Sequence, residues 1–304
     1  MLLGVLVGLL TSAGCQAKLS VIGTNLTYNG HQIFLSGANQ AWVNYAHDFG
    51  HNHYSKGMST FETTLSDIQS HLGNSVRVWL HIEGESTPQF DNNGYVTGID
   101  NTLISDMRAY LQAAKRHNIL IFFSLWNAAV TSKSHYRLNG LMVDTRQLQS
   151  YIDHALKPIA YPLKNEKALG GWDMINEPEG EIKPGGSSSE PCFDTTHLSG
   201  SREGWAGRLF VNWQAAAIKK VDPGAMVTVG SWNTKTDTDT MGFHNLYSDY
   251  CLVKAGGKQS QSFSNFRLNK PMVIGEFNQE HGARMSSEFM FEWAYTKGYS
   301  GAWT

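Results

Sequence analysis

Two glutamates at the ends of strand-like segments are the clearest chemical signal in the sequence. Glu177 directly follows the strand-like segment 172–176, and Glu276 ends a second such segment, an apolar run that begins at Met272. The carboxyl end of a buried parallel strand is where barrel enzymes carry their catalytic groups. Two carboxyls facing each other about 5 to 5.5 Å apart are the apparatus of a retaining glycosidase, and their repulsion would raise the pKa of one of them. Taken singly, either glutamate could instead belong to a structural ion pair.

The segments that must position these glutamates alternate between short strands and amphipathic helices. Helical stretches are expected from Asp100, from about Glu203 and from Ser286 or Ser287. The expected strands, several of them apolar on both faces, are 33–38, 75–80, 120–125, 172–176, 226–230, 272–275 and 299–303.

This alternation predicts an α/β fold, a TIM (β/α)₈-type barrel formed by residues 18–304 as a single catalytic domain. A doubly wound sheet is the alternative. It loses its main support because no G-x-G-x-x-G or G-x-x-x-x-G-K-[ST] motif follows any strand.

Composition excludes several classes of protein. The chain has 304 residues, 41% of them hydrophobic and 12% aromatic, so it can form a substantial core and is not disordered. Its 24 basic and 26 acidic residues leave a net charge of −2. A nucleic-acid partner is not expected, because it would require a basic face.

The first residues have the composition of a secretory signal. Residues 1–10 are almost wholly apolar, too short a run to span a bilayer, and small residues follow as far as Ala17. We therefore expect a signal peptide over 1–17 and an extracellular, secreted protein, with a membrane anchor as the alternative. Cys192 and Cys251 would then remain as one disulfide or as two buried thiols, and Asn25 as a glycosylation acceptor.

The motifs around both glutamates resemble those of glycoside hydrolase family 5. Asn-Glu-Pro at 176–178 and Gly-Glu-Phe at 275–277 look like the paired signature of that family. The wider text at 36–39, 76–79, 276–281 and 301–303 resembles the family's animal endo-β-1,4-mannanases, and the similarity runs from about Lys18 to the last residue.

The resemblance implies specific roles for individual residues. Glu177 would be the general acid/base and Glu276 the nucleophile. Asn176 would hydrogen-bond the sugar 2-hydroxyl, and Arg77 would keep the nucleophile ionised and oriented. Trp303 would form the apolar floor of the subsite at the cleaved bond.

Other aromatic and histidine residues are weaker candidates. Trp126 and Trp232 follow strands, where they could line a subsite or pack at the barrel rim. His81 is a candidate sugar contact. The loop cluster of His47, His51 and His53 is interpreted as a solvated cleft loop rather than as a metal site, since it lacks helix-spaced partners or a nearby Cys pair. No cofactor or metal is implied.

One part of the family pattern is missing. The resemblance implies a strand with a His-x-Tyr motif between the fifth strand and the nucleophile strand, and no such strand is visible. A segment of family sequence is expected to be absent after about Lys258, together with the closing helix after the last strand. With seven recognisable strands the barrel would be opened or distorted, unless 251–254 fills the gap. A shortened isoform, an incomplete gene model and a fragment remain open.

We therefore expect a secreted, monomeric endo-β-1,4-mannanase that cleaves mannan, galactomannan and glucomannan with retention, and no membrane association after signal cleavage. A β-1,4-glucanase of the same family and a catalytically impaired mannan-binding protein are the alternatives.

Overall fold

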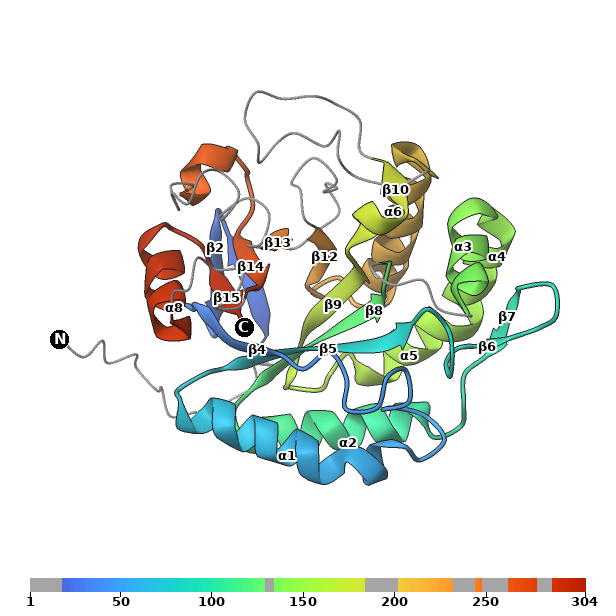
Figure 1. Cartoon of the computed structure of the whole chain (residues 1–304), viewed down its shortest axis with the longest axis horizontal. Helices are drawn as coiled ribbons and strands as arrows, with labels where there is room; N and C mark the ends of the chain where they lie inside the picture. The colour runs from blue at the N-terminus through green and yellow to red at the C-terminus, as the bar shows by residue number, and fades with distance from the viewer. Residues whose placement is uncertain (1–17, 129–133, 184–201, 232–243, 248–261, 278–285) are drawn as a thin grey trace.

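Eight parallel strands form a closed barrel within the described part of the chain (Figure 1). The structure is a computed structural model that describes residues 18–128, 134–183, 202–231, 244–247, 262–277 and 286–304. The strands are β4 (Leu35–Asn39), β5 (Ser75–Ile82), β8 (Leu120–Trp126), β9 (Leu169–Asn176), β12 (Val227–Ser231), β13 (His244–Tyr247), β14 (Met272–Glu276) and β15 (Gly301–Trp303). The predicted (β/α)₈-type barrel is confirmed, and the seven expected strands are all present.

The expectation of an open barrel needs correction, because β13 occupies the remaining position. It pairs with β12 on one side and with β14 on the other, where Tyr247 stands opposite Glu276. Sequence reading missed this strand because it has only four residues, His-Asn-Leu-Tyr, without an apolar run. The segment 251–254, considered as a filler of the gap, lies outside the described residues, as do 1–17, Cys192, Cys251 and Trp232.

Alternation along β5 shows how the barrel separates core from site. Val76, Val78 and Leu80 are fully or almost fully buried in the main apolar cluster, together with residues of the surrounding helices. Arg77 lies on the other face of the strand and reaches across the barrel interior to Asp173 on β9. A parallel strand packed on both faces accounts for the unbroken burial of β5.

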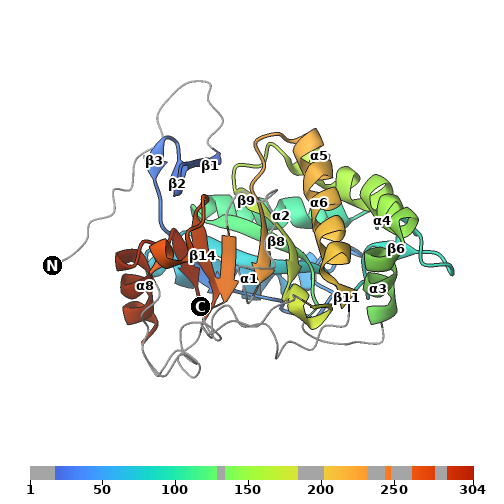
Figure 2. The same cartoon turned by 90° about the horizontal axis from the view of Figure 1, so that it is seen from above.

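Helices surround the strands (Figures 1 and 2). They are α1 (Tyr54–Ser70), α2 (Leu103–Arg116), α3 (His135–Val143), α4 (Thr145–Tyr151), α5 (Lys157–Leu163), α6 (Gly204–Val221) and α8 (Ser287–Thr296), with a π-helical turn η1 (Ile152–Leu156) between α4 and α5. No helix among the described residues is long and apolar enough to cross a membrane.

Helix boundaries follow local sequence in two cases. The apolar stripe predicted after Asp100 is buried in α2, although the helix begins at Leu103. Ser286 caps α8 as expected, since its hydroxyl accepts a hydrogen bond from the Phe289 amide. Local pattern therefore located α2 and α8, and α6 begins next to the expected start at Glu203, whereas α1, α3, α4 and α5 were not predicted.

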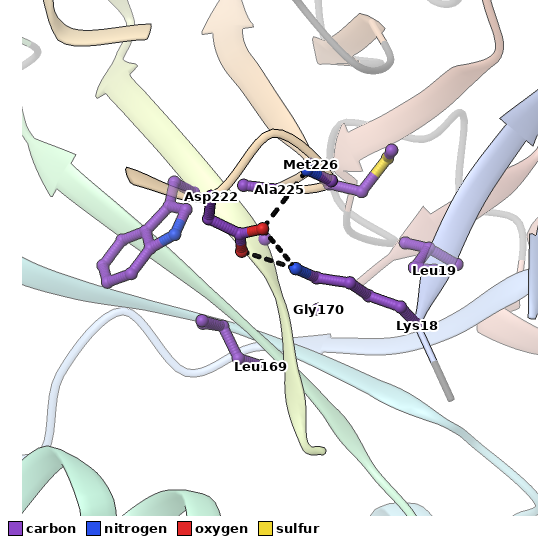
Figure 3. A pocket seen from close by; sticks show the side chains of 10 residues that line it. Lys18, Leu19, Leu169, Gly170, Asp222, Ala225 and Met226 are labelled. Carbon is purple, nitrogen blue, oxygen red and sulfur yellow. Dashed lines mark hydrogen bonds and ion pairs between the residues drawn. The ribbon is translucent and has the colours of Figure 1, made fainter. Parts of the chain in front are cut away.

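A small antiparallel sheet of β1 (Leu19–Ile22), β2 (Asn25–Tyr28) and β3 (His31–Gln32) packs at the amino-terminal end of the barrel. Its Leu19 and Leu26 join an apolar cluster with residues near the start of the barrel strands, among them Leu120 and Met226. Beside this cluster is a small pocket where Lys18 Nζ lies 2.5 Å from both carboxylate oxygens of Asp222 (Figure 3). This end of the barrel is therefore closed by packing and an ion pair, opposite the glutamates.

The remaining short elements lie outside the barrel sheet and helix ring. They are β6 (Gln89–Phe90), β7 (Val96–Gly98), β10 (Ile182–Lys183), β11 (Arg202–Glu203) and two 3₁₀ turns, η2 (Pro178–Gly180) and η5 (Phe263–Phe266).

Candidate active site

The two predicted catalytic glutamates lie at the carboxyl ends of their strands. Glu177 is the residue immediately after β9, and Glu276 is the last residue of β14, with β12 and β13 between the two strands in the barrel. The Glu276 side chain is 40% exposed, and Glu177 is partly exposed. Both glutamates therefore keep exposed surface at the carboxyl edge of the barrel, although Oε2 of Glu276 is itself buried.

Glu177 leaves its strand with an unusual backbone. Its φ of 49° and ψ of 58° are left-handed, a conformation that non-glycine residues adopt rarely. Its amide donates to the Gly230 carbonyl at 2.7 Å, and its carbonyl accepts from Gly180 at 3.0 Å. These bonds hold the abrupt turn that ends β9.

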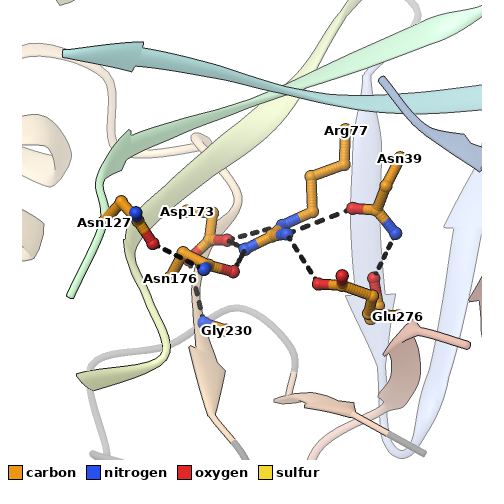
Figure 4. A network of polar contacts seen from close by, with 8 residues as sticks. Asn39, Arg77, Asn127, Asp173, Asn176, Gly230 and Glu276 are labelled. Carbon is orange, nitrogen blue, oxygen red and sulfur yellow. Dashed lines mark hydrogen bonds and ion pairs between the residues drawn. The ribbon is translucent and has the colours of Figure 1, made fainter. Parts of the chain in front are cut away.

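A buried arginine organises the floor of the site (Figure 4). The Arg77 side chain is completely buried, and its Nε and Nη2 donate to Asp173 Oδ2 at 2.8 and 2.6 Å. Nη2 also donates to Asn176 Oδ1 at 2.9 Å, and Nη1 donates to Asn39 Oδ1 at 3.1 Å. The guanidinium plane is thereby fixed by strands β4, β5 and β9 together.

Glu276 is the second carboxylate near this cation. Its Oε2 lies 3.9 Å from Arg77 Nη1, at ion-pair distance (Figure 4). The preceding Gly275 carbonyl accepts from Asn39 Nδ2 at 2.7 Å, and the following Phe277 amide donates to the Trp303 carbonyl at 3.1 Å. A positive charge at this distance favours the ionised form of the Glu276 carboxyl group.

Asp173 supplies the buried counter-charge. Burial raises the pKa of Asp173, and the adjacent Arg77 guanidinium acts in the opposite direction. Its other oxygen, Oδ1, accepts the Gly230 amide at 2.9 Å. Since Gly230 also accepts the Glu177 amide, the same residue connects the arginine cluster to the turn that carries Glu177.

The oxygen and the nitrogen of the Asn176 side-chain amide are both hydrogen-bonded. Its Oδ1 accepts from Arg77, and its Nδ2 donates to Asn127 Oδ1 at 2.8 Å. Residue 176 is fully buried. The contact with a sugar hydroxyl that the family resemblance implies for Asn176 stays a prediction.

The structure disagrees with the subsite role expected for Trp303. Its indole is 0% exposed and contacts Phe122 with ring centroids 5.0 Å apart. Its Nε1 donates to the Ser75 hydroxyl at 2.8 Å, and it belongs to the apolar cluster near the amino-terminal end of the barrel. The side chain thus packs inside the barrel rather than forming a platform at the glutamates.

Trp126 and His81 are likewise interior residues. Both are 0% exposed, and their rings lie 4.8 Å apart. Trp126 Nε1 donates to Gln214 of α6 at 3.2 Å, and Tyr151 packs edge-on against both rings. The packing alternative is therefore the one the structure favours for Trp126, and the sugar contact expected for His81 is not supported.

The histidine loop after β4 brings its three rings together. His53 lies 5.6 Å from His47 and 5.7 Å from His51 between ring centroids, and His51 Nδ1 is 3.1 Å from Asp100. Among the described residues no group of three or more His, Cys, Asp or Glu side chains is arranged to hold a metal ion.

Sequence reasoning missed several members of the site. Asn39, Asn127 and Asp173 complete the polar cluster around Arg77. Asn39 is the last residue of β4, Asn127 follows β8, and Asp173 lies within β9. Their position in or beside a barrel strand was their only signal. Trp42, 38% exposed, follows β4 and contacts Trp79, with ring centroids 5.1 Å apart and the ring planes inclined by 58°. The Trp79 ring lies beside Arg77.

Paired glutamates at the carboxyl edge of a parallel barrel define a class, the glycoside hydrolases. No family model matches the chain. The chain is 77% identical to the mannan endo-1,4-beta-mannosidase of Mytilus edulis, over all of this chain and 92% of that protein, and 36% identical to that of Cryptopygus antarcticus, over 94% and 83%. The chain belongs to the endo-β-1,4-mannanases of glycoside hydrolase family 5.

Solved structures of such enzymes match the fold. The β-mannanase of Mytilus edulis superposes with a TM-score of 0.80 at 77% identity, covering 95% of this chain and 91% of that one. The β-1,4-mannanase of Aplysia kurodai gives 0.84 at 39% identity, covering 94% and 91%.

The Mytilus alignment also bears on the missing segment. It extends over 336 positions, whereas this chain has 304 residues, all of them aligned. Some positions of the relative therefore have no counterpart here, which agrees with the expectation that a stretch of family sequence is absent.

Proposed function

We propose that this protein is a secreted endo-β-1,4-mannanase that hydrolyses mannan, galactomannan and glucomannan with retention of configuration. The observation that carries the mechanism is the pair of Glu177 and Glu276 at the carboxyl edge of the barrel, with Arg77 at 3.9 Å from Glu276. The substrate class follows from the names of the relatives, both of which are mannan endo-1,4-beta-mannosidases.

The reaction takes place in two displacements. Glu276 attacks the anomeric carbon while protonated Glu177 transfers its proton to the departing glycosidic oxygen, so that the C–O bond breaks and a glycosyl ester of Glu276 forms. Ionised Glu177 then takes a proton from water as that water attacks the same carbon and releases Glu276. Two inversions at one carbon give net retention.

The arginine cluster serves this sequence by fixing charge. Arg77 is held by Asp173, Asn39 and Asn176, so its charge does not need to reorganise when Glu276 loses or regains its negative charge. Asn176, adjacent to Glu177, is the proposed partner of the sugar 2-hydroxyl.

Localisation and assembly complete the proposal. Residues 1–17 would direct export and be removed, and the enzyme would act outside the cell as a monomer on polysaccharide. Asn25, the first residue of β2, is exposed, as a glycosylated asparagine must be.

Substitution of the two carboxyls tests the mechanism. Glu276→Ala and Glu177→Gln should each abolish release of reducing ends from galactomannan and glucomannan without changing the unfolding midpoint. Glu288→Gln, an exposed glutamate of α8, is the matched control and should retain full activity. Substantial turnover by either site variant would refute the assignment, and carboxymethylcellulose cleaved in preference to mannan would indicate a glucanase.

A mannan-binding protein without turnover is the second candidate, because positions of the Mytilus relative are absent from this chain. Retardation of the wild-type protein in a mannan-containing gel, with no product formed, would favour it. Measurable wild-type hydrolysis would exclude it.

A further inference from the structure

A histidine outside the predicted site connects two loops at the carboxyl edge of the barrel. His135 is the first residue of α3, and its side chain is 15% exposed. Its Nε2 lies 2.7 Å from Glu181 Oε1, and its Nδ1 lies 3.9 Å from Glu83 Oε2. Glu83 follows β5, the strand of Arg77, and Glu181 follows the turn that begins at Glu177.

Only the three-residue turn η2 separates Glu181 from Glu177. The Gly180 amide donates to the Glu177 carbonyl, and the Glu181 amide donates to the Pro178 carbonyl, both at 3.0 Å. Glu177 itself has the unfavourable left-handed backbone, which persists only where neighbouring contacts hold it. The Gly230 carbonyl restrains one side of this turn, and the His135–Glu181 contact restrains the other.

The helix that carries His135 is itself firmly attached. Arg137, two residues after His135 in the first turn of α3, donates to the Gly84 carbonyl, and its guanidinium lies 5.2 Å from the centroid of the Phe90 ring. Leu138 and Leu141 of α3 are fully buried in the main core. Through Glu181, His135 therefore connects the turn after Glu177 to helix α3, which is anchored in the core.

We propose that His135 is a positioning residue, which through Glu181 holds the turn that places the acid/base carboxyl of Glu177. This inference rests on the proposed role of Glu177. His135 does not touch the substrate or exchange a proton with it. Its Nε2–H donates to the Glu181 carboxylate, and loss of this bond lets the turn move so that the Glu177 carboxyl leaves hydrogen-bonding distance of the glycosidic oxygen.

Misplacement of a proton donor has a signature that general loss of structure lacks. A sugar leaving group must be protonated as the C–O bond breaks, whereas a 2,4-dinitrophenolate leaves without a proton. Because kcat/KM covers the steps up to formation of the glycosyl-enzyme, a displaced Glu177 lowers kcat/KM for mannan and leaves kcat/KM for a dinitrophenyl glycoside almost unchanged.

The experiment compares mannopentaose with 2,4-dinitrophenyl β-mannobioside as substrates of His135→Ala, His135→Gln and Glu181→Ala. An ångström-scale displacement predicts a loss of about 10- to 100-fold in kcat/KM for mannopentaose in His135→Ala. The loss for the dinitrophenyl substrate should stay within about 3-fold, since that step needs no proton. His135→Gln, whose amide can donate near the position of Nε2, should recover most of the mannopentaose activity.

Two further variants, and the single variant Glu181→Ala, make the result decisive. His154→Ala replaces an exposed histidine of η1 and should change neither substrate. The double variant His135→Ala/Glu181→Ala should lose no more than either single variant, because both remove the same contact. Should His135→Ala fail to fold, Glu181→Ala leaves α3 intact and carries the same prediction.

Equal losses on both substrates, or no loss on mannopentaose, would overturn the positioning role. Glu177→Ala separates this outcome from failure of the proposed function. It must itself show a large loss on mannopentaose and a small one on the dinitrophenyl substrate, and without that pattern the acid/base assignment fails whatever His135 does.

Discussion

His81 predicts a specific sensitivity of the fold to acid. Its ring is completely buried between Trp126 and Tyr151, and burial lowers the pKa of His81 from the ordinary value of 6.5 to about 3. The folded protein therefore keeps this imidazole neutral at pH values where the unfolded chain binds a proton.

The direction and size of the effect follow from that difference. The stabilising contribution is fully present above about pH 6.5, falls as the pH decreases, and stops changing below about pH 3. Each pH unit within this window corresponds to about 1.4 kcal/mol. Between pH 7 and pH 4.5, proton binding by His81 in the unfolded state should therefore lower the free energy of unfolding by about 3 kcal/mol.

Urea unfolding of the wild type and His81→Asn at pH 7 and pH 4.5 measures this contribution. Carboxyl groups with shifted pKa values, such as Asp48, whose pKa burial raises, are present in both proteins and cancel in the comparison. The variant is expected to be less stable at pH 7 because its packing is poorer, but to lose about 3 kcal/mol less on acidification. His154→Asn should follow the wild type. Parallel pH dependences of wild type and His81→Asn would refute the argument.

Two further substitutions test the packing of the site and of the barrel. Asp173→Asn removes the buried carboxylate beside Arg77 and should lower the free energy of unfolding by about 3 to 5 kcal/mol, measured by urea unfolding, because a buried charge loses its nearest partner. An unchanged midpoint of urea unfolding would show that the negative charge of Glu276 is sufficient to compensate the positive charge of Arg77. Gly37→Ala should prevent soluble expression or lower the melting temperature strongly, because its Cβ would lie 1.7 Å from the Ser75 carbonyl oxygen. In the control Gly98→Ala, the nearest atom is 3.4 Å from the new Cβ. A comparable loss of melting temperature in both variants would contradict the explanation by a steric clash at Gly37.

Much of the fold was predictable because it is encoded locally. The segments that became β5, β8 and β14 are mostly apolar over a short stretch of sequence, and the stripe of α2 has helical spacing. The strand β13 could not be predicted in this way, since its four residues acquire their conformation by pairing with β12 and β14.

The tryptophans show the same limit in the site. Trp126 and Trp303 end their strands, as a sugar platform would, yet both side chains are buried. Trp42 was not singled out by its sequence position and is exposed beside Trp79. Position along a strand indicates the end of the barrel where a residue lies, but not whether its side chain has open space around it.

The sequence alone determined the barrel class, the family resemblance and the placement of Glu177 and Glu276 at strand ends, because these depend on short-range pattern and on motifs. Only the tertiary structure decided that Arg77 is shared between Asp173 and Glu276 and that His135 contacts Glu181 just after the turn that follows Glu177. The physical reason is distance along the chain. Ion pairs and hydrogen bonds between residues dozens to hundreds of positions apart leave no periodic trace, and they exist only once the closed barrel brings the carboxyl ends of its strands to one edge.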